Sequence, residues 1–342
     1  MEAIPGIQQY QSLIATELRS ILAGRELPLY DMLRYHLGWT NAAGEPVEAS
    51  SGKGLRPLLC LLTCAAVGGR AETAVPAAAA LELLHNFTLI HDDIQDASPE
   101  RRHRATVWHI WGTPQAITAG DAMYGLSRLA LLRLEKSGVN PTKVLRAAEL
   151  MDNACLRICE GQYMDVAFEE SLEVGVPSYL DMIGFKSASL IQCAMETGAV
   201  LGTEEESVVG AMARCGRNLG MAFQIQDDIL GIWGREAITG KPSESDVLKR
   251  KKTLPVVYTL NSVLGSERDE LLRIYMKEGG PSTEDAAAVP AILDRVGARE
   301  YAENMARDFC HRALDEMMSV PLVDGARESL TSLANFLIAR EY

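Results

Sequence analysis

The chain of 342 residues has 33 basic and 46 acidic residues, and its net charge of −13 argues against nucleic acid as a partner. Hydrophobic residues make up 47% and charged residues 23%, an ordinary composition for a soluble protein. Aromatic residues are only 6% whereas Ala and Leu are abundant, which favours helices over sheets.

Helical patterns follow one another along the chain, and no stretch alternates apolar and polar residues as a strand does. In chain order, the predicted helices cover residues 6–24, 27–38, 57–67, 72–94, 114–136, 141–168, 177–201, 204–230, 254–264, 266–278, 286–297, 299–318 and 323–340. The predicted loops include residues 41–54, 98–112, 235–252 and 279–284. No linker rich in Pro, Gly or Ser divides the chain, so we expect an all-α fold with one domain over residues 1–342.

Neither a membrane span nor a signal peptide is predicted. The longest apolar run, residues 58–67, is far short of the roughly 20 residues that cross a bilayer. Residues 1–24 lack a basic start followed by an apolar core. The Cys count is odd and no CxxC pair exists, so we expect buried reduced thiols rather than zinc ligands. These thiols are Cys60, Cys64, Cys155, Cys159, Cys193, Cys215 and Cys310. The expected location is the cytoplasm, without an integral membrane segment.

Asp92, Asp93 and Asp96 follow an apolar segment, residues 77–90, that has no Gly or Pro and is expected to be a buried helix. Since each helical residue turns by about 100°, Asp92 and Asp96 share one face and Asp93 lies beside it. Three clustered carboxylates repel one another and are costly to desolvate, so a cation must compensate them. Oxygen ligands with an open coordination sphere suit Mg²⁺ bridging to a phosphorylated substrate.

Asp227 and Asp228 repeat this arrangement at the end of another apolar stretch, within residues 223–230. Either cluster alone could equally be a solvated helix end. Two clusters, each on an apolar helix, favour one cavity that both of them face.

Basic residues stand where a second anion would need them. Lys53 and Arg56 lie at the entry of a predicted helix, where backbone N–H groups favour phosphate, although alone they would suggest only a solvated loop. Arg101 and Arg102 follow the first cluster closely enough for the chain to turn back, and Arg binds phosphate through paired hydrogen bonds. Lys186 begins an otherwise apolar helix segment, and Lys241 and Lys251 lie in the loop after the second acidic pair. This clustering in an acidic protein predicts a site for a metal-bound polyanion.

His85 lies seven residues before Asp92, on a similar face of the predicted helix. A single His on an apolar helix is more often a core residue, but this one faces the acidic cluster and could bind phosphate. His91 points elsewhere, which favours packing or support of the aspartates.

Four motifs, in this order and spacing, resemble those of the trans-isoprenyl diphosphate synthase (polyprenyl synthetase) family. They are GKGLRP at 52–57, LIHDDIQD at 89–96 with the arginine pair after it, FQIQDDIL at 223–230, and GKP…SD…KKTLP at 240–255. The resemblance covers about residues 50–260. It implies an isoprenoid synthase-type helical bundle around a central apolar cavity, usually a homodimer. Members condense an allylic diphosphate with isopentenyl diphosphate, and Mg²⁺ is the cofactor.

The resemblance also implies roles for single residues. The catalytic residues are Asp92, Asp93, Asp96, Asp227, Asp228 and Lys186. Asp92, Asp96 and Asp227 hold Mg²⁺, with three ions when substrate is bound. Isopentenyl diphosphate is bound by Lys53, Arg56, His85 and Arg102. The allylic diphosphate is bound by Arg101, Lys186, Ser187, Gln224, Lys241 and Lys251, with Gln162 and Asp165 matching a GQxxD element that lines the same cavity.

Four positions depart from the family pattern. Gly231 replaces the last Asp of the second DDxxD motif, so we expect weaker Mg²⁺ binding on that side rather than lost activity. Gly54 replaces an Arg of GGKRxRP, His103 replaces the Gly of RRG, and Ser187 replaces the Thr of KT but keeps a hydroxyl.

The reaction that the resemblance implies needs no protein nucleophile. The clamped allylic diphosphate ionises, its cation is shielded from water by the apolar cavity, and the double bond of isopentenyl diphosphate attacks it. A proton is then lost to the departing pyrophosphate. Phe87 and Thr88 stand five and four residues before Asp92, and one ring there without an inserted motif residue resembles the geranylgeranyl-forming (C20) members.

Several other functions remain open. A farnesyl (C15) or longer (C25 and above) product would keep the enzyme class. A class I terpene cyclase would need a different second motif and no isopentenyl site. A non-catalytic subunit of a heteromeric synthase would tend to lose the aspartates, and both aspartate pairs are intact here. This alternative stays open because Gly231 replaces the last Asp of the second motif.

Overall fold

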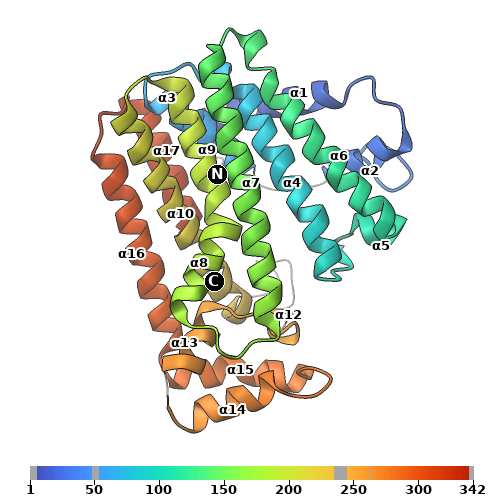
Figure 1. Cartoon of the computed structure of the whole chain (residues 1–342), viewed down its shortest axis with the longest axis vertical. Coiled ribbons are helices and arrows are strands. Elements are labelled where there is room, and N and C mark those ends of the chain that lie inside the picture. The colour runs from blue at the N-terminus through green and yellow to red at the C-terminus, as the bar shows by residue number, and fades with distance from the viewer. Residues whose placement is uncertain (1–5, 48–53, 235–244, 263, 339–342) are drawn as a thin grey trace. The chain divides into compact units, whose positions relative to one another are not determined.

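The computed structural model describes residues 6–47, 54–234, 245–262 and 264–338. Over these residues the chain is almost entirely helical (Figure 1), which confirms the all-α prediction. The helices of the first half are α1 (Ile7–Leu22), α2 (Pro28–His36), α3 (Leu55–Ala66), α4 (Val75–Gln95), α5 (Val107–Trp111), α6 (Thr113–Leu132) and α7 (Pro141–Glu169). Those of the second half are α8 (Val176–Ile183), α9 (Ser189–Gly202), α10 (Glu206–Trp233), α12 (Ser245–Leu248), α13 (Leu254–Ser262), α14 (Ser266–Tyr275), α15 (Thr283–Arg295), α16 (Ala298–Met318) and α17 (Asp324–Ile338).

Shorter elements complete the chain. The 3₁₀ turns η1 (Ala71–Ala74) and η2 (Glu135–Ser137) precede α4 and α7, and a π-helical turn, η3 (Gly184–Ala188), joins α8 to α9. The strands β1 (Glu100–Arg101) and β2 (Arg104–Ala105) form a small antiparallel hairpin.

The predicted helices agree with the observed ones to within a few residues, but the helix predicted over 177–201 is interrupted by the π-helical turn at 184–188, and two predicted loops contain further elements. The loop at 98–112 contains the hairpin and α5, and the loop at 235–252 contains α12. The hairpin was missed because its turn residues, Arg102 and His103, are not the Asn-Gly or Asp-Gly pair that predicts such a turn.

The contacts within the chain divide it into two units, which are described separately. Unit 1 comprises Met1–Asp152, Cys193–Gly210 and Pro321–Leu333. Unit 2 comprises Asn153–Gln192, Ala211–Val320 and Ala334–Tyr342.

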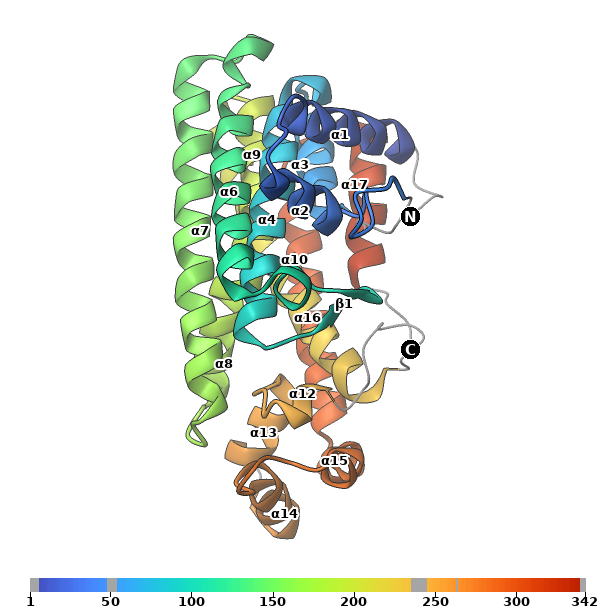
Figure 2. The same ribbon diagram turned by 90° about the vertical axis from the view of Figure 1, so that its right-hand side faces the viewer.

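Unit 1 is built around α4, whose first ten side chains are all buried. Figures 1 and 2 show α6 alongside α4, and α3 packs on α4 as well. Gly120 of α6 permits this approach, because a Cβ there would lie 2.2 Å from His91 Nε2. The segment Ala71–Gln95 is long and apolar enough to cross a membrane by length and composition, but 67% of its apolar window is buried in the structure. A core helix has the same composition.

Two apolar clusters lie among the described residues of unit 2. In the first, Tyr179 of α8 packs with Ile225 of α10 and Leu254 of α13. The second gathers residues of α13, α14 and α15, among them Leu271 and Val289. The capping box that begins α15 comes from Ser282 and Asp285, whose side chains bond each other's backbone N–H.

All seven thiols are free, but the expectation that all are buried is wrong for two of them. Cys155 is partly exposed and Cys159 is exposed, both on α7. Leu156 between them is 63% exposed, so an apolar helix segment was mistaken for a buried one.

Candidate active site

The first acidic cluster lies at the C-terminal end of α4. Asp93 is only 2% exposed, whereas Asp92 and Asp96 are partly exposed. Arg101 bridges two of the carboxylates, since its Nε donates to Asp93 Oδ1 at 2.7 Å and its Nη2 to Asp92 Oδ2 at 3.1 Å. Burial opposes the charge of Arg101, but Asp93 and Asp92 outweigh it and raise the pKa of the guanidinium. Arg101 therefore supplies positive charge that the clustered carboxylates require.

The β1–β2 hairpin follows α4 along the chain (Figure 2). Its residue Arg101 returns to the cluster, because its guanidinium bonds to Asp93. The turn residues Arg102 and His103 have φ values of 54° and 59°. Positive φ at both central residues is the geometry of a type I′ turn. For side chains other than Gly this conformation costs about 1–2 kcal/mol per residue. Strain of this kind concentrates at functional sites, and here it accompanies the return of the chain toward the aspartates.

A second group of polar residues surrounds His85 on α4. Arg56 Nη1 lies 3.1 Å from His85 Nε2. Burial lowers the pKa of His85 well below its usual value, and Arg56 and Arg102 lower it further. The ring is therefore neutral at pH 7 and accepts the Arg56 hydrogen bond. Arg56 and Arg102 beside a neutral imidazole are donors suited to a phosphate group.

The side chains of Phe87 and Thr88, the two residues predicted to set product length, contact different parts of the structure. Thr88 Oγ1 donates to His85 O of its own helix at 2.7 Å. The Phe87 ring lies against His91, with centroids 4.9 Å apart, and against Tyr124 of α6 at 5.4 Å. The sequence has no aromatic residue next to Phe87, but the fold brings one from another helix.

In unit 2, the two aspartates of the second motif have different environments. Asp227 is exposed at the end of α10, whereas Asp228 is 7% exposed. Asp228 accepts three hydrogen bonds, from Tyr179 Oη at 2.5 Å, Gln224 Nε2 at 3.0 Å and Leu254 N at 2.9 Å. Burial raises the pKa of Asp228 to about 7 against these bonds. Asp228 is thus tied to the start of α13, and Asp227 is the more open carboxylate.

Two predicted diphosphate ligands share one carboxylate. Lys186 Nζ donates to Asp165 Oδ2 at 2.6 Å, and Lys251 Nζ donates to the same oxygen at 2.9 Å. Lys251 also pairs with Glu169 at 2.7 Å. Burial disfavours the Asp165 charge, but the two lysines outweigh it and lower the pKa of the carboxyl. Asp165 therefore keeps both ammonium groups close together.

The π-helical turn at Gly184–Ala188 displays Lys186 and Ser187. Gly161 of α7 lies so close that a Cβ there would be 2.2 Å from Lys186 N. Gly161 and Asp165 are one turn apart on α7, so the backbone contact and the ion pair act on the same lysine. Ser187 Oγ donates to Gln224 Oε1 at 2.6 Å, which links the turn to Asp228 through Gln224.

Three predicted site residues have other outcomes. Lys53 and Lys241 lie outside the described residues. Gln162 is partly buried, and its Nε2 has no hydrogen-bond partner within the described part of the chain.

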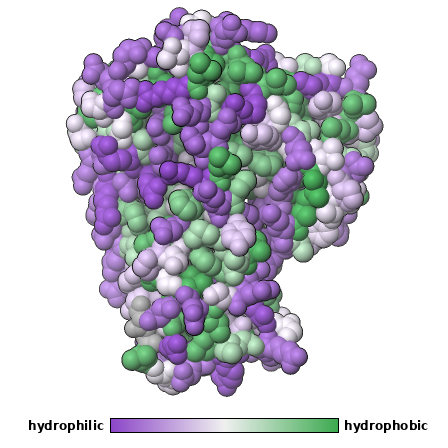
Figure 3. Space-filling view, in the orientation of Figure 1, coloured by the Kyte–Doolittle hydropathy of each residue, from purple (hydrophilic) through white to green (hydrophobic). Residues whose placement is uncertain are grey.

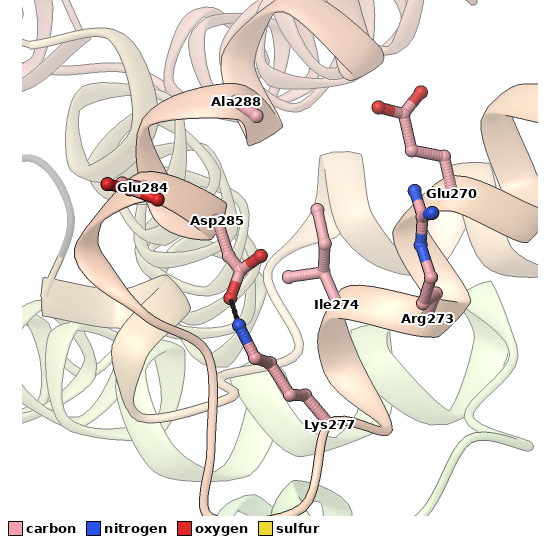
Figure 4. A pocket seen from close by; sticks show the side chains of 7 residues that line it. All are labelled: Glu270, Arg273, Ile274, Lys277, Glu284, Asp285 and Ala288. Atoms are coloured by element: carbon pink, nitrogen blue, oxygen red, sulfur yellow. Dashed lines mark hydrogen bonds and ion pairs between the residues drawn. The ribbon is translucent and has the colours of Figure 1, made fainter.

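A separate charged pocket of about 470 Å³ lies between α14 and α15. Figure 4 shows Lys277 and Asp285 pointing toward each other across it, where they form an ion pair. None of the residues predicted to bind substrate lines this pocket.

Comparison with known proteins identifies the chain. The polyprenyl synthetase family profile matches residues 38–293. The chain belongs to the polyprenyl synthetase family. It is 36% identical to a (2E,6E)-farnesyl diphosphate synthase of Mycobacterium tuberculosis over 99% of this chain and 93% of the relative. It is 37% identical to a geranylgeranyl diphosphate synthase of the same organism over 94% of this chain and 89% of the relative. The crystal structure of a polyprenyl synthetase from Streptomyces coelicolor has a TM-score of 0.89, 35% identity, and coverage of 97% and 98% of the two chains.

Membership of the polyprenyl synthetase family makes the chain a trans-prenyltransferase that elongates prenyl diphosphates. The departure at Gly231 acquires a structural explanation in this family. A Cβ on Gly231 would lie 2.5 Å from Asp246 Oδ2, so a carboxylate from α12 already occupies that space. An aspartate at 231 would bring a second negative charge against it.

Two polar residues of unit 1 were missed in the sequence. Glu82 is buried one turn before His85, and Asn86 Nδ2 donates to Glu82 Oε1 at 3.1 Å. Burial raises the pKa of Glu82, while Arg56 and Arg102 oppose the rise. A carboxylate inside an otherwise apolar segment was the available signal, because such a group needs nearby cations.

Proposed function

We propose that the chain is a Mg²⁺-dependent geranylgeranyl diphosphate synthase that condenses isopentenyl diphosphate with an allylic diphosphate. The observation that carries this proposal is that each unit has an acidic helix end with cationic donors beside it. In unit 1 these are the aspartates that follow one another along α4 and its C-cap, with Arg101. In unit 2 they are the aspartates near the end of α10, which Gln224 and Ser187 link to the turn of Lys186, whose ammonium group shares Asp165 with Lys251. Acidic and basic groups side by side suit a metal-bound diphosphate.

Asp92 on α4, Asp96 at its C-cap and Asp227 on α10 would hold Mg²⁺. All three offer hard oxygen donors and retain access to solvent. Within the described ranges, no three carboxylate, imidazole or thiol groups converge into a preformed metal cage. This fits an ion whose shell is completed by substrate phosphates and water, as is usual for Mg²⁺. When bound, the metal neutralises the diphosphate and so assists its departure.

The side chains have distinct proposed tasks. Arg101 and the lysine pair, Lys186 and Lys251, bind the allylic diphosphate with Ser187 and Gln224, while Arg56, His85 and Arg102 bind isopentenyl diphosphate. Asp93 and Asp228 orient other groups, since both are buried, unlike Asp92, and their carboxylates receive hydrogen bonds from neighbouring elements. From the motifs alone, Lys53 is proposed to bind isopentenyl diphosphate and Lys241 the allylic diphosphate.

The C20 product rests on Phe87, a single bulky ring before the first motif, with Thr88 next to it. Relatives of similar identity are named for both C15 and C20 products, so identity does not decide the length. A farnesyl or a longer product is the alternative within the same enzyme class.

We also propose that the enzyme is a homodimer that uses the outer face of α7. Leu145, Leu156 and Tyr163 are 72%, 63% and 76% exposed. At about 100° per residue they form one stripe along the helix. Hydrophobic residues are visible among hydrophilic ones on the molecular face in Figure 3. An exposed apolar stripe of this kind is typical of an interface. L156E and Y163E should give a monomer by light scattering, and an unchanged mass would contradict the interface.

A single domain over residues 1–342 and a cytoplasmic location are proposed from the sequence.

Product analysis tests the proposed function. Purified enzyme, Mg²⁺ and isopentenyl diphosphate would be incubated with dimethylallyl, geranyl or farnesyl diphosphate in turn, and product masses read. A C20 diphosphate is expected. A C15 or C25 product would overturn the length assignment, no elongation would favour the non-catalytic subunit, and a hydrocarbon would favour the cyclase.

A further inference from the structure

Phe87 does not lie on the face of α4 that carries the metal-binding aspartates, as a residue that directly blocks the growing prenyl chain would be expected to do. At about 100° per residue, Thr88 lies about 40° around the helix from Asp92, whereas Phe87 lies about 140° away. Thr88 is thus on the side of the metal-binding aspartates, and Phe87 points sideways. The α6 helix lies on that side, because Phe87 contacts Tyr124 and the neighbouring His91 contacts Ile117 O at 3.2 Å.

The Phe87 ring is held from two directions. His91, one turn later on α4, meets it edge-on at an interplanar angle of 69°. Tyr124 meets it at a tilt of 52° with centroids 5.4 Å apart. Offset and edge-to-face contacts are the favourable arrangements of aromatic pairs, so both contacts restrict the ring.

Tyr124 is itself anchored. Its Oη donates to Asp152 Oδ1 of α7 at 3.4 Å, and Arg128 Nη1 lies 3.1 Å from the same carboxylate oxygen. Gly120, one turn before Tyr124, packs directly on His91. These contacts leave α6 little freedom to move away from α4.

We infer that Tyr124 is a positioning residue for product length, which fixes the Phe87 ring so that it stops the growing chain beyond Thr88. The inference rests on the proposed function, because it concerns the point at which elongation ends. Thr88 is too small to stop the chain, so the stop depends on a ring whose orientation a second helix maintains. Removing the Tyr124 ring leaves space beside α6 into which Phe87 turns, and the chain then extends further.

The test compares wild type, Y124A, Y124L and Y124F by product mass. Y124A should make mainly products at least one C5 unit longer than wild type, and Y124F, which keeps the ring, should retain the wild-type length. Y124L fills most of the space without an aromatic ring and serves if Y124A does not fold. Longer products from Y124L support the inference, and wild-type products from whichever of the two variants folds overturn it. Lengthening by Y124F would also overturn it, because the hydroxyl would then be responsible.

A binding measurement separates this inference from the proposed function. The affinities for a C20 and a C25 diphosphate are measured by calorimetry for the same proteins, without turnover. Y124A or Y124L should bind the C25 diphosphate about tenfold more tightly relative to C20 than wild type does, a difference of about 1.4 kcal/mol. An unchanged ratio overturns the role of Tyr124 even in an active synthase. A wild type that does not elongate contradicts the proposed function, while the ratio still decides the role of Tyr124.

Discussion

Replacing Asp165 with Asn should destabilise the free enzyme because two lysines depend on one carboxylate oxygen. Lys186 Nζ and Lys251 Nζ lie 2.6 and 2.9 Å from Asp165 Oδ2, so the two nitrogens are at most 5.5 Å apart. Two like charges at that distance repel by about 3 kcal/mol at an effective dielectric constant of about 20. Glu169 still offsets part of the Lys251 charge at 2.7 Å. We therefore expect the free energy of unfolding to fall by about 2–3 kcal/mol.

The assay is thermal unfolding with and without pyrophosphate. For a chain of this size the loss corresponds to a fall in Tm of about 3–4 °C. Pyrophosphate supplies the negative charge that D165N lacks, so it should raise the Tm of D165N more than that of wild type.

A matched control is Glu169→Gln. Its carboxylate is one-third exposed and contacts Lys251, so the loss should stay below about 1 kcal/mol. A Tm for D165N within about 1 °C of wild type, or an equal pyrophosphate shift in both proteins, would refute the reasoning.

Three further changes have defined outcomes. Asp93→Asn weakens the charge-assisted hydrogen bond from the Arg101 guanidinium of the hairpin, so kcat/KM should fall roughly 10- to 100-fold in steady-state assays. Gly161→Ala places a methyl group against the backbone of Lys186, and kcat/KM should fall roughly 100-fold as the π turn moves. Gly231→Asp restores the family motif but sets its carboxylate beside that of Asp246, and the two negative charges repel each other, so the free energy of unfolding should drop by about 1–3 kcal/mol and Mg²⁺ affinity, by calorimetry, should not improve.

Controls separate these effects from general damage. Gly125→Ala on α6, where nothing lies within 4 Å of the new Cβ, should leave kcat/KM unchanged. Adding Asp246→Asn to Gly231→Asp should recover stability. Wild-type kinetics for Asp93→Asn or Gly161→Ala, or no recovery in the double variant, would contradict the corresponding explanation.

The helices were predictable because their apolar spacing and proline positions are local signals. The hairpin was not, since Arg102 and His103 adopt left-handed backbone conformations that no local preference indicates. Arg101, next to this turn, forms ion pairs with Asp92 and Asp93. These ion pairs exist only in the folded chain, so the sequence does not indicate them.

The candidate site residues could be named from motifs, but their divisions of labour could not. The sequence gives Asp227 and Asp228 nearly the same neighbours, whereas the fold exposes one and ties the other to Tyr179. Similarly, the motif identified Asp165 but not its partner. In the fold, Lys186 of the π turn lies against α7 and bonds to Asp165. Tyr124 is far from Phe87 in the chain, so their contact is tertiary information.

The π-helical turn at Gly184–Ala188 has a consequence for insertions and deletions in related chains. A π turn carries one more residue than an α-helical turn over the same span. Deleting one residue here would convert the π turn into an ordinary α-helical turn and join α8 and α9 into one continuous α-helix, with the two flanking segments in nearly their present register. The widened turn that sets Lys186 against Gly161 and Asp165 would be lost, although no substitution had occurred. Residue number in this segment should therefore be conserved more strictly than residue type, and a single-residue gap in an alignment marks a relative with a different lysine geometry.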